Sequence, residues 1–263
     1  MCEILSIDPG TFRLAFSHLE WNGGDPCSEE SYAVKWACAV NLSTKNEAND
    51  DHDNESDMVN QLENLESFLS KNRNLRRIVR AEERATRRHG DKLQVVMEQT
   101  EGVRDKNVLL SLMRVNMISG YLYCYFRSKG LKVTVVPKSF KFGWSSLSTL
   151  VDDRILKNVP EAKTKRDLMR LRKKEWIQSE RRKLRKKAVC HWIRYLLLKG
   201  YSSQSVASDV AKCKSYEKLN HVADSISQAA RFVAEREKPR GRGDRAAKLT
   251  KEALEHVASA LAF

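Results

Sequence analysis

The chain has 263 residues, of which 41% are hydrophobic and 31% are charged, and its formal net charge is +14. That length and apolar content allow one large domain with insertions and a real hydrophobic core. No apolar run approaches the roughly 18 residues that a transmembrane helix needs, so no transmembrane helix is expected. The excess of positive charge favours a polyanionic partner, nucleic acid first and an anionic membrane surface second.

Short apolar runs predict three consecutive strands at residues 3–8, 13–21 and 32–40. Turn-forming residues separate these runs, so we expect an antiparallel meander. The third run alternates with a period of two, which places its apolar side chains on one face of the sheet. These side chains are Tyr32, Val34, Trp36, Cys38 and Val40.

A polar, acidic stretch at residues 45–57 predicts a disordered loop. Apolar residues at helical spacing then predict a helix from residue 58, running on through a basic stretch to residue 88. The remaining predicted elements are strands at 92–98 and 131–136, a helix at 108–126 between them, and a last core helix at 219–233. Taken in chain order, the predicted elements indicate an α/β fold with a mixed five-stranded sheet flanked by helices.

Residues 138–205 predict a basic helical insertion, of one or two helices, before the last core helix. Within it, residues 163–187 hold 13 lysines and arginines and three acidic residues, a net charge of +10. A charge run is often only a solvated helix face, but with the overall charge of the chain we favour contact with nucleic acid. The candidate phosphate contacts, chosen from their place in basic segments, are Lys138, Arg181, Arg182 and Lys186.

Two acidic residues close apolar strands. Asp8 follows the first strand and precedes the tight turn of Pro9 and Gly10, and Glu98 closes the strand at residues 92–98. Taken alone, such an Asp is a common turn former, and such a Glu could face solvent. If the two strands are neighbours, Asp8 and Glu98 converge at the same edge of the sheet.

A third acidic residue lies on the last core helix. Because each helical residue turns by about 100°, His221, Asp224 and Gln228 share one face, roughly opposite the apolar face. Alone, this pattern is typical of an ordinary amphipathic helix with polar residues at the surface.

The three carboxylates together indicate a metal centre. Carboxylates from two strand ends and a late helix can surround one site, and like charges so close are costly unless a cation lies among them. Hard oxygen ligands with few thiols suit Mg²⁺, for which Mn²⁺ can substitute. Two such ions, about 4 Å apart, clamp a phosphodiester and activate the attacking water. No small-molecule cofactor is expected.

The residues Ile4 to Thr11, the pair Glu98 and Gln99, and His221 with Asp224 resemble the motifs of the RuvC-like Holliday junction resolvases of the RNase H-like superfamily. The resemblance is to the poxvirus-type resolvases of large DNA viruses, with fungal mitochondrial relatives near, and it covers residues 1–42, 90–138 and 215–235. It implies an RNase H-like fold, a homodimer, two Mg²⁺ per active site and symmetrical nicking of branched DNA at four-way junctions.

Carried over, the resemblance makes Asp8, Glu98 and Asp224 carboxylate ligands. His221 stands where many members have a second Asp, and we prefer metal ligation for it over a role as a proton donor to the leaving group. On this interpretation residues 1–237 form the nuclease domain, with the acidic insert 45–57 and the basic insert 138–205. Residues 238–263 then form a basic C-terminal tail.

Six cysteines without a C-x-x-C pair indicate reduced thiols in an intracellular protein, and no signal peptide is expected before the first strand. The basic runs and the resemblance point to the nucleus or a cytoplasmic viral replication site.

Other functions stay open. A nuclease of the same fold could act on another branched DNA or on RNA–DNA hybrids. In ribonucleases H, which the chain also resembles, the corresponding glutamate lies on a helix, whereas Glu98 is predicted at a strand end, which favours a resolvase. A sugar-kinase or actin-like protein needs a second glycine-rich phosphate loop, which the sequence lacks. A catalytically inactive DNA-binding protein on the same scaffold would have no reason to keep Asp8, Glu98 and Asp224.

Overall fold

The computed structural model describes ten stretches of the chain. They are residues 2–10, 12–25, 31–42, 55–89, 93–99, 109–137, 145–158, 175–199, 216–237 and 249–262.

The centre of the molecule is a mixed five-stranded sheet with the strand order β3-β2-β1-β4-β5. Strands β1, β2 and β3 form an antiparallel meander, and β4 and β5 continue from β1 in parallel. The sequence-based prediction of an α/β fold with a mixed five-stranded sheet is therefore confirmed. The strands are β1 (Cys2–Asp8), β2 (Arg13–Trp21), β3 (Tyr32–Asn41), β4 (Leu93–Glu98) and β5 (Lys132–Val136).

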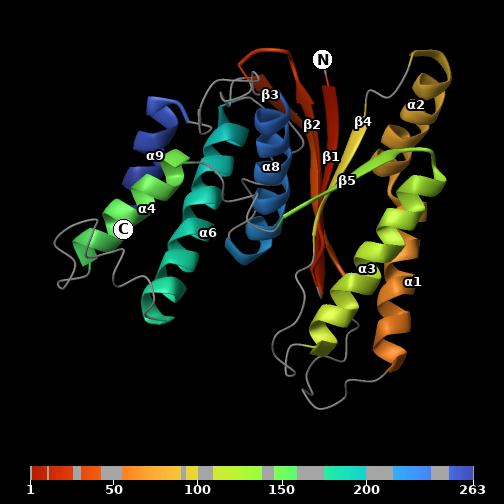
Figure 1. Ribbon diagram of the computed structural model, residues 1–263, viewed down its shortest axis with the longest axis horizontal. Helices are drawn as coiled ribbons and strands as arrows, with labels where there is room; N and C mark the ends of the chain where they lie inside the picture. The colour runs from red at the N-terminus through yellow and green to blue at the C-terminus, as the bar shows by residue number, and fades with distance from the viewer. Residues whose placement is uncertain are drawn as a thin grey trace.

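Helices cover both faces of the sheet (Figure 1). On one face lie α1 (Glu55–Lys71), α2 (Arg73–His89) and α3 (Leu109–Ser128). Helix α8 (Tyr216–Arg236) lies directly on the other face. Beyond α8 are α6 (Glu175–Leu198), α4 (Ser145–Asn158) and α9 (Lys251–Ala262), which pack on one another.

Each face of the sheet has its own hydrophobic core. Alternate strand residues such as Ile4 and Val96 pack with α8, α6, α4 and α9, and their neighbours Leu5 and Val95 pack with α1, α2 and α3. A strand buried on both faces has apolar residues at consecutive positions, which explains the adjacent apolar pairs Ile4–Leu5 of β1 and Val95–Val96 of β4.

A β-bulge corrects the predicted face of β3. Leu19 pairs with Val34 and His18 pairs with Trp36, so Lys35 is an extra residue in β3. An extra residue reverses the alternation of side chains beyond it. Tyr32 and Val34 therefore pack on the α8 side, whereas Trp36, Cys38 and Val40 pack on the α1–α3 side. The prediction that all five share one face was wrong.

The predicted helix from residue 58 to residue 88 is also corrected, because it is two helices that meet at Asn72. Its side-chain Oδ1 accepts a 2.9 Å hydrogen bond from the backbone N–H of Leu75, which caps the start of α2. Helix α1 begins at Glu55, so the predicted loop at residues 45–57 loses its last three residues to the helix. The rest of that loop lies outside the described residues.

The basic insertion forms two described helices, α4 and α6, and belongs to the core on the α8 side. Part of the predicted tail, helix α9, buries Ala253, Val257 and Leu261 in the same core. The proposed division at residue 237 stays a prediction. None of the helices in the described stretches is long and apolar enough to span a membrane.

Candidate functional site

Asp8 and Glu98 end two adjacent parallel strands. The last paired residues of β1 and β4 are Ile7 and Met97, and the two acidic residues follow directly. Because side chains alternate along a strand, Asp8 lies on the same face as Ser6, and Glu98 on the same face as Val96. That face is the one covered by α8. Both carboxylates are buried, with exposed fractions of 4% for Asp8 and 7% for Glu98.

Buried polar contacts hold α8 against the sheet at this end. The Gln228 side-chain Nε2 donates to Ser6 Oγ at 3.0 Å and to the carbonyl of Ile7 at 3.1 Å, and lies 3.4 Å from the carbonyl of Val96. One glutamine therefore joins α8 to both β1 and β4. These bonds fix the position of α8 along the strands and its rotation about its own axis, which apolar packing alone would leave less defined.

A second buried contact joins α8 to β2. The hydroxyl of Ser225 donates to the carbonyl of Ser6 at 3.0 Å and accepts from the hydroxyl of Ser17 at 2.8 Å. The sequence analysis placed Gln228 beside His221 and Asp224 without giving it a role, and it missed Ser225. The signal that could have found them is the set of polar residues on the face of the helix that meets the sheet.

Helix α8 brings Asp224 and His221 to the same region. Asp224 precedes Ser225 directly and lies one turn before Gln228, and it is only 3% exposed. His221 lies nearer the start of α8, and its Nδ1 is 3.3 Å from Oδ2 of Asp8, to which an Nδ1–H donates. The structure thus joins His221 directly to Asp8 and places Glu98 and Asp224 on the same face of the sheet.

Gly10 closes the turn beside this pair. A methyl group at position 10 would collide with the backbone carbonyl of Arg13 and would lie 3.7 Å from Cε1 of His221. The turn after Asp8 therefore requires a residue without a Cβ, because the backbone of β2 passes close to it.

The chemistry of the donor set suits a hard divalent cation. The three buried carboxylates offer the hard oxygen ligands that Mg²⁺ and Mn²⁺ prefer, whereas the imidazole is a less usual ligand for these ions. As the side chains lie, however, the described residues contain no group of three or more His, Cys, Asp or Glu side chains that could hold a metal ion. The contact shown is the pair of Asp8 and His221.

The described cysteines, Cys2, Cys38, Cys124 and Cys190, form no disulfide with one another. Cys27 and Cys213 lie outside the described residues, so the reduced state of the thiols stays a prediction. Burial raises the pKa of Cys38 to about 12, so its thiol stays protonated and is a poor metal ligand.

The predicted phosphate contacts differ in their surroundings. Arg181 forms an ion pair with Asp152 at 2.7 Å, and both side chains are largely buried between α6 and α4. Its guanidinium joins two helices. Arg182 and Lys186 are exposed on the same helix, and Lys138 lies outside the described residues. The sequence could not separate Arg181 from its neighbours because its partner lies 29 positions away.

No known family profile matches the sequence, and no curated protein matches it. Among solved structures, the chain is similar to Holliday junction resolvases. The Thermus thermophilus RuvC in complex with a Holliday junction substrate has 10% identity and a TM-score of 0.39, with 90% of this chain and 97% of that chain covered. The Fowlpox virus resolvase in complex with its substrate Holliday junction DNA has 14% identity and a TM-score of 0.40, with 90% and 99% covered.

A shorter likeness is to the Aquifex aeolicus Ppx/GppA phosphatase, with 9% identity, a TM-score of 0.27 and coverage of 57% of this chain and 41% of that one. Likeness at these levels does not assign a function, which has to come from the residues of this chain.

Proposed function

We propose that the chain is a structure-selective endonuclease that cleaves four-way DNA junctions by metal-dependent hydrolysis of phosphodiesters. The observation that supports the proposal is that three buried acidic side chains, Asp8, Glu98 and Asp224, lie on the face of the sheet that α8 covers, with His221 in contact with Asp8. Burying a carboxylate is costly, and a site for divalent cations would explain why a protein keeps three of them on this face.

In this mechanism Asp8, Glu98 and Asp224 would hold two Mg²⁺ ions, and His221 would be a further ligand. When bound, the ions supply an activated water and stabilise the leaving oxygen. The Asp8 carboxylate orients the imidazole of His221 through the 3.3 Å contact. Gln228 and Ser225 act as positioning residues, because their hydrogen bonds fix α8 and therefore Asp224.

The excess positive charge supplies the grip on DNA. Arg182 and Lys186 of α6 remain candidates for phosphate contacts, as does Lys138, whereas Arg181 belongs to an ion pair. Two symmetrical nicks in one junction suit a two-fold assembly, so a homodimer is part of the proposal. We also propose an intracellular location, in the nucleus or at a cytoplasmic viral replication site.

The test is cleavage of a synthetic four-way junction with Mg²⁺ or Mn²⁺, beside linear duplex, a flap and an RNA–DNA hybrid, for the wild type and for Glu98→Gln. Paired symmetrical nicks in the junction that disappear in Glu98→Gln support the proposal. Cleavage of the hybrid or the flap instead would retain a nuclease with another substrate. Binding to the junction without cleavage under either metal would indicate an inactive DNA-binding protein.

A further inference from the structure

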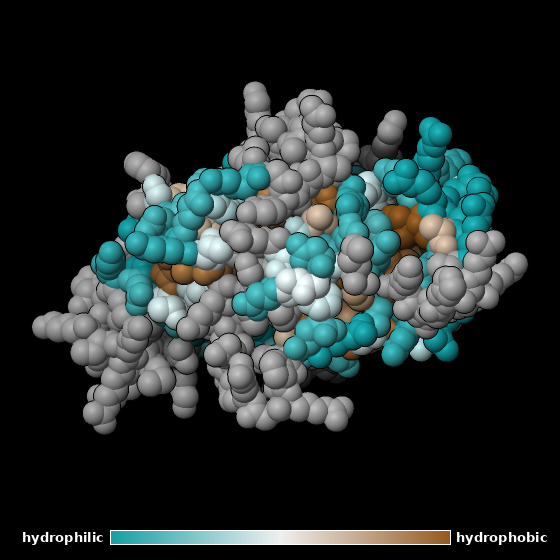
Figure 2. All heavy atoms as spheres, turned by 90° about the horizontal axis from the view of Figure 1, so that it is seen from above, coloured by the Kyte–Doolittle hydropathy of each residue, from teal (hydrophilic) through white to brown (hydrophobic). Residues whose placement is uncertain are grey.

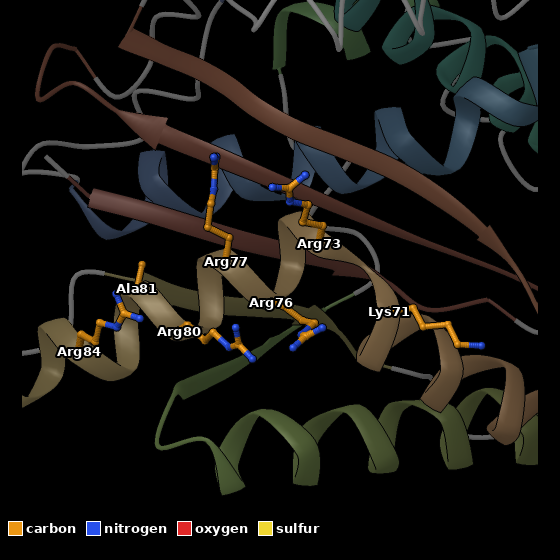
Figure 3. Close-up of a pocket in the computed structure, with 7 residues that line it drawn as sticks. All are labelled: Lys71, Arg73, Arg76, Arg77, Arg80, Ala81 and Arg84. Carbon is orange, nitrogen blue, oxygen red and sulfur yellow. The ribbon is translucent and has the colours of Figure 1, made fainter.

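The outer face of α2 carries a groove lined almost entirely by basic side chains, on the opposite face of the sheet from α8. The groove has a volume of about 630 Å³ (Figure 3). Its basic residues are Lys71, Arg73, Arg76, Arg77, Arg80 and Arg84. Seen from above, the described side chains at the end of the molecule where α2 lies are largely hydrophilic (Figure 2).

These six side chains are exposed, and none of them forms an ion pair with an acidic side chain in the described part of the chain. A solvated helix face usually alternates its charges, because like charges three or four residues apart repel one another. The acidic residues of α2 lie elsewhere. Glu82 is buried, and its Oε1 accepts a 3.0 Å hydrogen bond from the backbone N–H of Leu93. Glu83 does not line the groove but lines a neighbouring cavity, which it shares with Glu66 of α1 and with Arg76 and Arg80.

The basic side chains that line the groove project from a helix that is packed and hydrogen-bonded against the rest of the protein. Leu75, Ile78 and Val79 of α2 are buried in the core beneath these side chains, Asn72 caps the start of the helix, and Glu82 ties its second half to β4. At a rise of about 1.5 Å per residue, the row from Arg73 to Arg84 is roughly 16 Å long. This length corresponds to about five base pairs of a duplex, at roughly 3.4 Å per pair.

The kind of basic residue that lines the groove indicates which anion it can bind. Five of the six basic residues are arginines. The planar guanidinium donates two parallel hydrogen bonds to phosphate oxygens, whereas a lysine offers a point charge. A row of this length is too long for one small anion and fits a series of phosphates along a strand.

We propose that this groove, the α2 arginine groove, binds the phosphate backbone of duplex nucleic acid as a second contact, separate from the exposed basic residues Arg182 and Lys186 of α6. That the duplex is an arm of a DNA junction rests on the function proposed above. Contact with phosphates alone carries no sequence information, so the groove adds affinity and orientation without base preference.

The experiment measures binding of the full-length chain to a linear DNA duplex as a function of salt, without divalent metal, so that cleavage plays no part. The variant is Arg77→Gln with Arg84→Gln. Each lost phosphate contact lowers the slope of log affinity against log salt by about one, so we expect a slope shallower by about two and affinity weaker by roughly 10- to 30-fold near 0.15 M salt.

Two matched variants serve as controls. Lys157→Gln with Lys251→Gln makes the same change in net charge on exposed residues of α4 and α9, and should leave the slope nearly unchanged. Arg77→Lys with Arg84→Lys keeps the charge and should restore most of the slope. All variants should melt like the wild type, because the side chains replaced are exposed.

An unchanged slope in Arg77→Gln with Arg84→Gln would overturn the inference, as would an equal change in the α4 and α9 control. Loss of binding to phosphatidylserine vesicles with unchanged duplex binding would assign the groove to a membrane surface and also overturn it. A shallower slope in a protein that cuts no junction would support the groove and refute only the proposed function.

Discussion

Helices α8 and α2 pack on opposite faces of one sheet and use their two sides in opposite ways. Helix α8 turns polar side chains toward the sheet, where Ser225, Gln228 and Asp224 are buried among the strands. Helix α2 turns mainly apolar side chains inward, with Glu82 hydrogen-bonded to β4 among them, and places its basic side chains outside. The buried polar side chains of α8 fix its position on the sheet through directional hydrogen bonds, whereas the charges on the outer face of α2 are available to a charged partner.

The largest effect should come from the buried carboxylate of α8. We expect Asp224→Asn to lower the rate of junction cleavage by roughly 1,000-fold or more, about 4 kcal/mol of activation free energy, because a neutral amide is a weak ligand for a divalent cation. Junction binding, measured by gel shift, should change little. A rate within a few-fold of the wild type would show that Asp224 is not part of the site.

The next largest effect should come from the apolar side of α2. Leu75 is fully buried, and Leu75→Ala should lower the free energy of unfolding by about 3 kcal/mol through lost packing and a residual cavity. Urea denaturation measures it. Arg77→Gln on the outer side of the same helix should change stability by less than about 0.5 kcal/mol. Equal effects of the two changes would contradict the division between the faces of α2.

A methionine on the inner side of either helix sharpens the comparison. Gln228→Met keeps the approximate volume but removes the hydrogen bonds to Ser6 and Ile7, so it should cost about 2 kcal/mol of stability. Junction cleavage should slow while junction binding stays unchanged, because Gln228 fixes the position of the helix that carries Asp224. Leu75→Met, a matched apolar exchange, should cost less than about 1.5 kcal/mol and leave cleavage intact. The interpretation fails if Gln228→Met cleaves and unfolds like the wild type.

The smallest effect should come from His191 of α6, the helix that packs against α8. Burial lowers the pKa of His191 below its usual 6.5, and Arg194, His256 and Lys187 lower it further. The unfolded chain then binds a proton more readily than the folded one, so this contribution to stability is present above pH 6.5 and is lost as the pH falls below it. His191→Gln should reduce the loss of thermal stability between pH 7 and pH 5. An unchanged pH profile would exclude this role for His191.

The strands and their order followed largely from the sequence, because short apolar runs between turns allow few alternatives. The face of β3 did not, because both faces of the sheet are covered, so the apolar alternation continues through the bulge at Lys35 without any visible break. The break at Asn72 had a signal, a capping residue before an apolar position, which the regular spacing of the helix obscured.

The residues of the site were predicted from their positions at strand ends and on one helix face, but their contacts were not. The sequence gives no indication that His221 meets Asp8 at 3.3 Å, or that Arg181 meets Asp152, because both contacts join distant parts of the chain. The arginines of α2 were visible as a basic stretch, but only the fold shows that Glu82 is buried against β4 and that neither Glu82 nor Glu83 lines the groove.

The contact between His221 and Asp8 spans 213 positions of the chain, and that between Ser225 and Ser17 spans 208. Contacts between such distant positions require a long loop to be closed, which costs entropy and slows folding. During synthesis, Asp8 and Glu98 leave the ribosome well before α8, which carries His221 and Asp224. The proposed nuclease is therefore incomplete throughout most of its own translation, and the ability to cut nucleic acid is among the last properties that the nascent protein acquires.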